Sequence, residues 1–147
     1  MKFSSELYID LIGKPFRGAK EPFDGTKYNC WDLVRTIYSR MGVDLPNPEI
    51  KCHEVLYLAH LVKEEKEGLG DKLTPIDTTK TYPIPAPALL LFNPEGDRTT
   101  HVGVYIGGGR FLHATDADGR GVCIEMTYSP LWRGRIEGYY LVRGSGE

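Results

Sequence analysis

The sequence predicts an α+β domain in which N-terminal helices pack on a central antiparallel β-sheet. Helical periodicity is confined to the first half of the chain, and short apolar runs with strand character follow one another in the second half. A parallel sheet would need helical crossovers between its strands, and no such alternation is present. With 147 residues the chain has the size of one domain, which we take to be residues 1–147.

Three segments have helical character. Residues 4–12 begin with serines suited to a helix cap and end at a glycine. A second helix is predicted from Asn29 to Gly42, because apolar side chains recur there at spacings of three and four and Asn29 is a good N-cap. Residues 51–67 show a third helical pattern, which ends in a charged run.

The second half of the chain predicts five strands. Each is a short apolar or alternating run that is separated from the next by turn residues. Their predicted bounds are 88–92, 101–106, 110–114, 121–126 and 136–143. The stretch "TYPIPAPA" before them predicts an extended lead-in, since proline is unsuited to the interior of a sheet.

Composition narrows the class of protein. Acidic and basic residues are interspersed and sum to a formal net charge of -2, so neither nucleic acid nor a membrane is an expected partner. Three thiols, Cys30, Cys52 and Cys123, predict reduced cysteines rather than a disulfide framework. The N-terminus lacks the apolar core of a signal peptide. We therefore expect a protein that is cytoplasmic when made and needs another carrier to reach an external target.

Cys30 is the first candidate for chemistry. A helix N-terminus lowers the pKa of a cysteine, because its N–H groups and the positive end of the helix dipole favour the thiolate. Cys30 also fits the apolar stripe of its helix, and buried free cysteines are common in protein cores. Position alone therefore leaves a nucleophile and a core thiol open.

The segment "HVGVYIGGGRFLHA" places two histidines on a predicted β-hairpin. A turn made of the three glycines would pair Ile106 with Arg110 and set Gly103 opposite His113. His101 and His113 would then be diagonal neighbours on one face, with Gly103 leaving the space between their rings open. A two-residue turn would instead place His113 on the other face.

The first register predicts a catalytic set of three residues. Cys30 would be the nucleophile, His101 the base that takes its proton, and His113 the residue that orients His101 on the same buried face. The same three side chains could instead bind zinc, with water as a fourth ligand.

Taken together, these motifs resemble the NlpC/P60 family of cell-wall cysteine peptidases. The likeness rests on "IGKPFRGAKEPFDGTKYNCWDLV", on "PALLLF", and on a hairpin whose second histidine follows the first by twelve residues. The resemblance implies a papain-like fold, no metal or cofactor, and Cys30, His101 and His113 as the catalytic residues. It also implies hydrolysis of amide bonds in peptidoglycan stem peptides, commonly between D-Glu and a diamino acid.

The residues around the thiol depart from the commonest family pattern, Asp-Cys-Ser-Gly. Here Asn29 precedes the cysteine and Trp31 and Asp32 follow it. Asp32 would place a negative charge within one helical turn of the thiol, which disfavours the thiolate. We expect Arg35, three residues further on, to pair with Asp32.

A further departure is Phe16, which stands where many members have a tyrosine whose hydroxyl lines the site. The backbone N–H of Cys30 is then the expected oxyanion donor. Phe16, Gly103 and the three residues flanking Cys30 are the candidates for substrate or oxyanion contacts.

The Cys-Trp form followed by "LVR" is similar to the branch found in phage tails and gene-transfer particles, which would make phage tail proteins the partners and carriers. A secretion-system amidase effector would equally lack a leader. A structural alternative is a catalytically weak or inactive tail-tip component, with Asp32 and Phe16 as signs of lost chemistry. An acyltransferase could use the same fold.

The remaining polar and sulfur side chains predict structure rather than chemistry. His53 and His60 are expected at a helix surface, and Cys52 and Cys123 in the core. The stretch 116–119 predicts a turn rather than a calcium loop. The sequence allows Trp132 to lie either in the core or in the wall of a substrate site.

Overall fold

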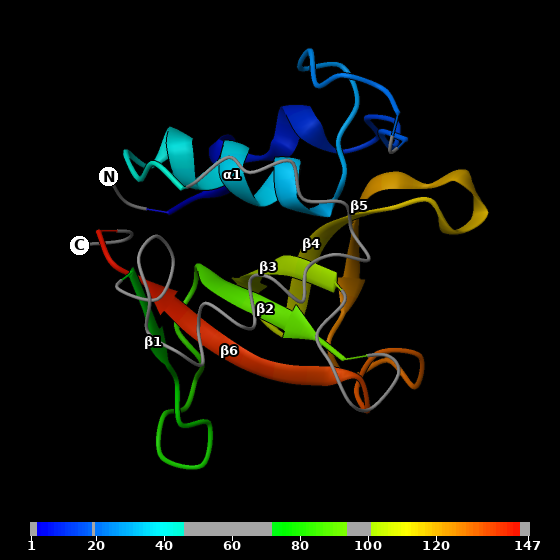
Figure 1. The fold of residues 1–147 in the computed structure, drawn as a ribbon. Coiled ribbons are helices and arrows are strands. Elements are labelled where there is room, and N and C mark those ends of the chain that lie inside the picture. Colours follow the sequence, from blue (N-terminus) through cyan, green and yellow to red (C-terminus); the bar gives the residue numbers. More distant parts are fainter. Residues whose placement is uncertain (1–2, 19, 46–71, 94–100, 145–147) are drawn as a thin grey trace.

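The computed structural model describes residues 3–18, 20–45, 72–93 and 101–144, in which a helix lies across one face of an antiparallel sheet (Figure 1). The helix is α1 (Cys30–Arg40). The strands are β1 (Leu73–Pro75), β2 (Ala88–Phe92), β3 (His101–Gly107), β4 (Arg110–Thr115), β5 (Gly121–Met126) and β6 (Ile136–Val142). Their order across the sheet is β1-β6-β2-β3-β4-β5, and every neighbouring pair is antiparallel. The predicted α+β class is confirmed.

The five predicted strands are β2 to β6, each within one residue of its expected bounds. The additional strand, β1, is three residues long and pairs with β6 at one edge of the sheet. So short a segment, with a proline at its end, carries no periodicity that a sequence pattern could reveal.

Helix α1 begins as its sequence predicts. The Asn29 side chain accepts from the Asp32 N–H at 2.7 Å, and the Asp32 carboxylate accepts from the Asn29 N–H at 2.9 Å, so the two residues form a capping box. The apolar stripe of the helix is buried against β3 and β4. This packing fixes the position of Cys30, its first residue.

The first predicted helix is wrong. Residues 4–12 form two 3-10 turns, η1 (Ser5–Leu7) and η2 (Ile9–Leu11), separated by Tyr8 with φ of -141°. A segment of this length gains too few hydrogen bonds to hold an α-helix by itself, so packing decides its shape. The predicted helix 51–67, with Cys52, His53 and His60, lies outside the described residues.

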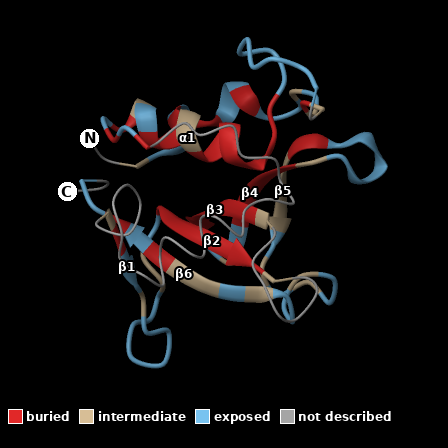
Figure 2. Ribbon diagram, viewed as in Figure 1, coloured by how far each residue is buried: buried red, intermediate tan, exposed pale blue. Residues whose placement is uncertain are grey.

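The sheet carries a buried cluster on each face, as the burial pattern in Figure 2 indicates for its central strands. On the α1 side, Val102, Val104 and Leu112 pack with the helix in the main core. Phe92 and Phe111 belong to a second cluster on the other side. Successive strand residues alternate between faces, so the odd-numbered positions of β3 and β4 belong to the second face.

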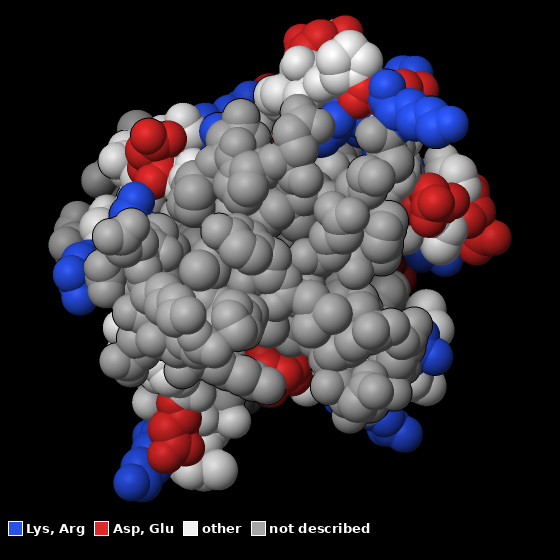
Figure 3. Space-filling view, in the orientation of Figure 1, with Lys and Arg blue, Asp and Glu red and all other residues white. Residues whose placement is uncertain are grey.

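Charged side chains of both signs are seen on the described part of one face. In Figure 3 acidic and basic side chains alternate around the described margin of the face shown. Among the described residues, none of the helices is both long and apolar enough to cross a membrane.

The segment after η2 runs along the start of β5. Gly13 N–H donates to the Val122 carbonyl and Val122 N–H donates to the Lys14 carbonyl, both at 2.9 Å. Gly121 has φ of +69°, and a Cβ there would clash with the Lys14 carbonyl. The close approach of the two backbones therefore requires glycine at this position.

We predict that Gly121→Ala destabilises the fold more than Gly119→Ala. Gly119 has a similar φ, +67°, but a Cβ there meets nothing within 4 Å. The control should cost about 1–2 kcal/mol for the left-handed backbone alone, and Gly121→Ala about 1–3 kcal/mol more for the clash. Urea unfolding of both variants measures the difference, and equal losses would show that the contact with Lys14 does not constrain the fold.

Candidate active site

The β3–β4 hairpin uses a register that was only partly predicted. Val104 pairs with Leu112, but Gly107 pairs with Arg110, so Ile106 forms a bulge and was wrongly expected to pair with Arg110. The turn itself is therefore two residues long. The bulge adds one residue to β3, and this restores the register that a two-residue turn alone would have shifted.

As a result, Gly103 lies opposite His113, as predicted. A Cβ on Gly103 would come within 3.3 Å of the His113 Cβ and 2.9 Å of the Leu112 carbonyl oxygen, so the glycine leaves the room that the two rings need. His101 Nε2 and His113 Nδ1 lie 2.7 Å apart, which is a direct hydrogen bond. The predicted contact between the two histidines is confirmed.

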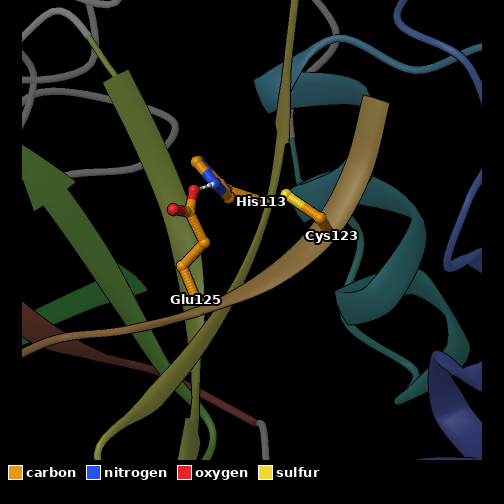
Figure 4. A group of neighbouring side chains, drawn as sticks. All are labelled: His113, Cys123 and Glu125. Atoms are coloured by element: carbon orange, nitrogen blue, oxygen red, sulfur yellow. Dashed lines mark hydrogen bonds and ion pairs between the residues drawn. The ribbon is translucent and has the colours of Figure 1, made fainter. Parts of the chain in front are cut away.

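Glu125 extends this pair to a third strand and was not predicted. His113 Nε2 lies 2.5 Å from Glu125 Oε2, and Trp132 Nε1–H donates to Glu125 Oε1 at 2.9 Å. Arg120 also donates to Oε1, at 3.0 Å. The alternation of "GVCIEM" with its neighbouring strand held the signal, because Cys123 pairs with His113 and Glu125 follows on the same face. Figure 4 shows the three side chains converging.

These contacts determine where the protons lie. Burial raises the pKa of Glu125, but the hydrogen bonds from Trp132 and His113 and the nearby charges, including that of Arg120, together outweigh it, so the pKa is lowered. An ionised carboxylate only accepts, so His113 Nε2 carries the proton that it donates. His113 Nδ1 then accepts, and the proton between the two rings belongs to His101 Nε2. The His101 nitrogen left for chemistry is Nδ1.

Both imidazoles are neutral at physiological pH. Burial, together with the neighbouring His113, lowers the pKa of His101 to about 3. Burial also lowers the pKa of His113 and outweighs the opposite effect of Glu125. A neutral His101 can accept a proton, which is the state that a general base needs.

Aromatic side chains enclose the histidines. The Trp132 ring stacks on His101 with centroids 6.0 Å apart and meets Phe92 edge-on at 5.2 Å. Phe92 is also the cross-strand partner of His101. Trp132, for which the sequence allowed either a core or a substrate-site position, is half-buried and packs beside the base. Its N–H donates to Glu125.

Cys30 occupies the first position of α1 and is fully buried in the main core. The two histidines contact aromatic rings of the second cluster, since Phe92 lies beside His101 and Phe111 beside His113. The contact of Cys30 with His101 stays a prediction. Figure 1 shows α1 beginning over the end of the sheet where β3 begins, and α1 packs on that strand.

The partner of Asp32 is Arg17, not Arg35. Arg17 Nε and Nη2 donate to the two Asp32 oxygens at 2.6 and 3.1 Å, and both side chains are buried. Arg35 instead donates weakly to the Leu45 carbonyl, at 3.4 Å. The bidentate cation offsets the negative charge that Asp32 would otherwise present to Cys30. Arg17 lies fifteen residues before Asp32 in an irregular loop, so no helical spacing links the two in the sequence.

The other predicted contact residues have structural surroundings. Trp31 is only 2% exposed and is part of the main core, and its contact with substrate stays a prediction. Asn29 is buried as the helix cap. Phe16 is partly buried against the main core and forms a parallel bridge with Tyr28. Gly103 acts by the space that it leaves.

The zinc alternative is not supported. Among the described residues, the one group of three or more metal-ligating side chains whose ligand atoms lie within 4.8 Å of one another is His113, Cys123 and Glu125, without Cys30 or His101. Cys123 is partly exposed, so the prediction of a core thiol is wrong there. The predicted turn at 116–119 is confirmed as the 3-10 turn η5 (Ala117–Gly119).

The chain matches known proteins over most of its length. A family model described as the NlpC/P60 family matches residues 13–140. The bifunctional muramidase/DL-endopeptidase CwlT of Bacillus subtilis is 26% identical over 127 residues, which are 84% of this chain and 31% of that protein. The chain thus spans about a third of this curated relative.

Solved structures show the same fold. An NLP/P60 protein of Staphylococcus aureus, described as similar to a lipoprotein, superimposes with a TM-score of 0.61 at 21% identity over 97% of this chain and 43% of that one. An NlpC/P60 protein of Bacillus cereus has a TM-score of 0.62 and 18% identity, over 95% of this chain and 40% of that chain. The NlpC/p60 domain of peptidoglycan hydrolase SagA has a TM-score of 0.55 and 20% identity, over 93% of this chain and 92% of that chain.

The family model covers the capped helix that begins at Cys30 and both histidines of the hairpin. The chain has the papain-like α+β fold of these solved structures. The chain belongs to the NlpC/P60 family.

Proposed function

We propose that this protein is a cysteine hydrolase that cleaves amide bonds in peptidoglycan stem peptides, with Cys30 as nucleophile. The observation that carries the proposal is the hydrogen-bond chain from His101 through His113 to Glu125, within a family match that also spans Cys30. The names of the relatives, a DL-endopeptidase and a peptidoglycan hydrolase, support the substrate class. The bond between D-Glu and a diamino acid is the proposed target.

In the proposed reaction, the Cys30 thiol gives its proton to His101 Nδ1 as sulfur attacks the scissile carbonyl carbon. The backbone N–H of Cys30 stabilises the oxyanion. His101 returns the proton to the leaving amine as the C–N bond breaks, which leaves a thioester on Cys30. Water then gives a proton to His101 and attacks the thioester, and the free acid and the thiol are released.

The hydrogen-bond chain from His101 to Glu125 stabilises the charge that forms in this reaction. When His101 accepts the proton it becomes an imidazolium in a buried site, where an isolated charge is costly. His113 keeps its Nδ1 lone pair directed at His101 because its Nε2–H is committed to Glu125. The negative charge of Glu125 is thereby placed two hydrogen bonds from the developing positive charge.

Asp32, one of the two residues that suggested lost activity, has a structural role. Asp32 is a member of the capping box and a partner of Arg17, so its presence beside Cys30 does not itself indicate an inactive protein. Delivery by a phage tail stays a prediction, and it rests on the Cys30-Trp31 form.

The first test is digestion of purified cell walls by wild type, Cys30→Ala and Cys123→Ala, with mass spectrometry of the released muropeptides. We expect Cys30→Ala to lose activity by at least about 1000-fold, because no nucleophile remains. Cys123→Ala is the matched control and should keep it. Retained digestion by Cys30→Ala would refute the proposal, and loss in Cys123→Ala alone would assign the nucleophile to β5.

A second prediction concerns Glu125 as a positioning residue. Glu125→Gln keeps an acceptor for His113 but removes the charge, so we expect kcat to fall by about 10- to 100-fold, within the range that acid–base assistance contributes, with KM little changed. Glu6→Gln, the same change at an exposed position, is the control. A purely structural role would instead lower the free energy of unfolding and leave kcat per folded molecule unchanged.

A third prediction follows from the protonation of His101. Its pKa is about 3 in the folded chain and about 6.5 in the unfolded chain, so below pH 6.5 the unfolded state binds one more proton. The free energy of unfolding should therefore fall as the pH drops from 6.5 towards 3, by up to about 1.4 kcal/mol per pH unit from this group. Urea titrations from pH 7 to pH 5 should show a shallower slope in His101→Gln, and an unchanged slope would contradict this protonation state.

A further inference from the structure

We infer that Cys123, together with His113 and Glu125 of the hydrogen-bond chain, forms a regulatory site that binds a thiophilic divalent cation such as Zn²⁺ and switches the base off. The site shares two residues with the chain and does not include Cys30. Its ligand atoms are His113 Nε2, the Cys123 thiol sulfur and Glu125 Oε2 (Figure 4). The inhibitory effect rests on the proposed function, whereas the binding itself does not.

The ligand set has the composition and spacing that zinc uses. One imidazole nitrogen, one thiolate and one carboxylate oxygen leave a fourth position for water. The three ligand atoms lie within 4.8 Å of one another, and bound zinc holds such atoms roughly 3.3–3.8 Å apart. Side-chain rotations that move the ligand atoms by about 1 Å would therefore complete the site, with the strands left in place.

The site is built into the strands and open to solvent. His113 and Cys123 are direct cross-strand partners, and Glu125 follows on the same face of β5. Strand β5 ends the order of the sheet. The Cys123 thiol is partly exposed and the Glu125 side chain is 14% exposed, so a cation reaches them from solvent although His113 is buried.

Before a metal enters, the ligand atoms have partners within the protein: His113 Nε2 binds Glu125 Oε2, and Arg120 hydrogen-bonds the Cys123 thiol. Arg120 and the Trp132 N–H both bind Glu125 Oε1, so Oε2 faces His113 and the thiol. The Arg120 side chain is 41% exposed, and it can turn towards solvent as the cation enters.

Metal binding would reverse the proton order of the histidine chain. Zinc needs the lone pair of His113 Nε2, so the neutral ring must carry its proton on Nδ1 and donate it to His101 Nε2. His101 then holds its own proton on Nδ1, the nitrogen proposed to accept from Cys30. The imidazoles keep their total number of protons, and the one proton released to water comes from the Cys123 thiol. The base is blocked although the metal does not touch Cys30.

Binding is tested with Co²⁺ as a spectroscopic substitute for zinc, in chains that lack the Cys30 thiol. We expect a thiolate-to-cobalt charge-transfer band in Cys30→Ala that zinc displaces, and no such band in Cys30→Ala/Cys123→Ala. Cys30→Ala/Cys52→Ala is the matched control and should keep the band. Absence of the band in Cys30→Ala, its survival without Cys123, or its loss without Cys52 would each overturn the inference.

The effect on catalysis is measured as the zinc concentration that halves wall digestion. It should be at least about tenfold higher in Cys123→Ala than in wild type, since changes even outside the ligand set cost 10- to 100-fold in metal affinity. Equal zinc sensitivity of the two proteins would refute the regulatory role. If neither protein digests walls, the proposed function fails, while the cobalt spectra of the inactive Cys30→Ala chains still decide whether the site exists.

Discussion

The candidate site depends on one hydrogen-bonded connection across three adjacent strands, from His101 on β3 through His113 on β4 to Glu125 on β5. A sheet can hold such a connection only if each strand presents its side chain to the same face at the same height. A shift of one residue in either pairing would move a member to the other face and break the chain. The bulge at Ile106 and the small side chain of Gly103 are the local features that satisfy this condition.

Charge compensation is the second constraint on the site. Burying a carboxylate beside the N-terminus of α1 would be costly if it were unpaired, and Arg17 provides a bidentate partner for Asp32. Because Arg17 comes from the loop before α1, the pair also ties that loop to the helix start. The Asn29 and Asp32 backbone groups are satisfied within the same network. The departure from the usual family residues around the cysteine is thus accompanied by a cation that keeps the region near neutral.

Most of the fold could be predicted from the sequence, but only some of the contacts in the candidate site could. Strand bounds, the helix start at Cys30 and the contact between His101 and His113 follow from periodicity, capping and hairpin register, which are local properties of the chain. The Arg17 and Glu125 contacts could not be predicted in the same way. Arg17 reaches Asp32 through an irregular loop, and Glu125 reaches His113 only if the pairing of β4 with β5 is known. The Arg17 contact depends on tertiary packing that no sequence period encodes, and the Glu125 contact needs the register of β4 and β5 in addition to the alternation of β5.

The surroundings of the thiol and of the histidines differ in polarity. Cys30 is buried in the apolar main core, whereas His101, His113 and Glu125 form the polar chain that a base requires. A buried imidazole chain placed within the main core would have needed further polar partners there, each with its own desolvation cost. Separating the two leaves the core almost wholly apolar and gathers the titratable groups where Trp132 and Arg120 can bind Glu125. The same arrangement makes the proton order of the chain sensitive to whatever binds Glu125 and Cys123 at the edge of the sheet, at a distance from the nucleophile itself.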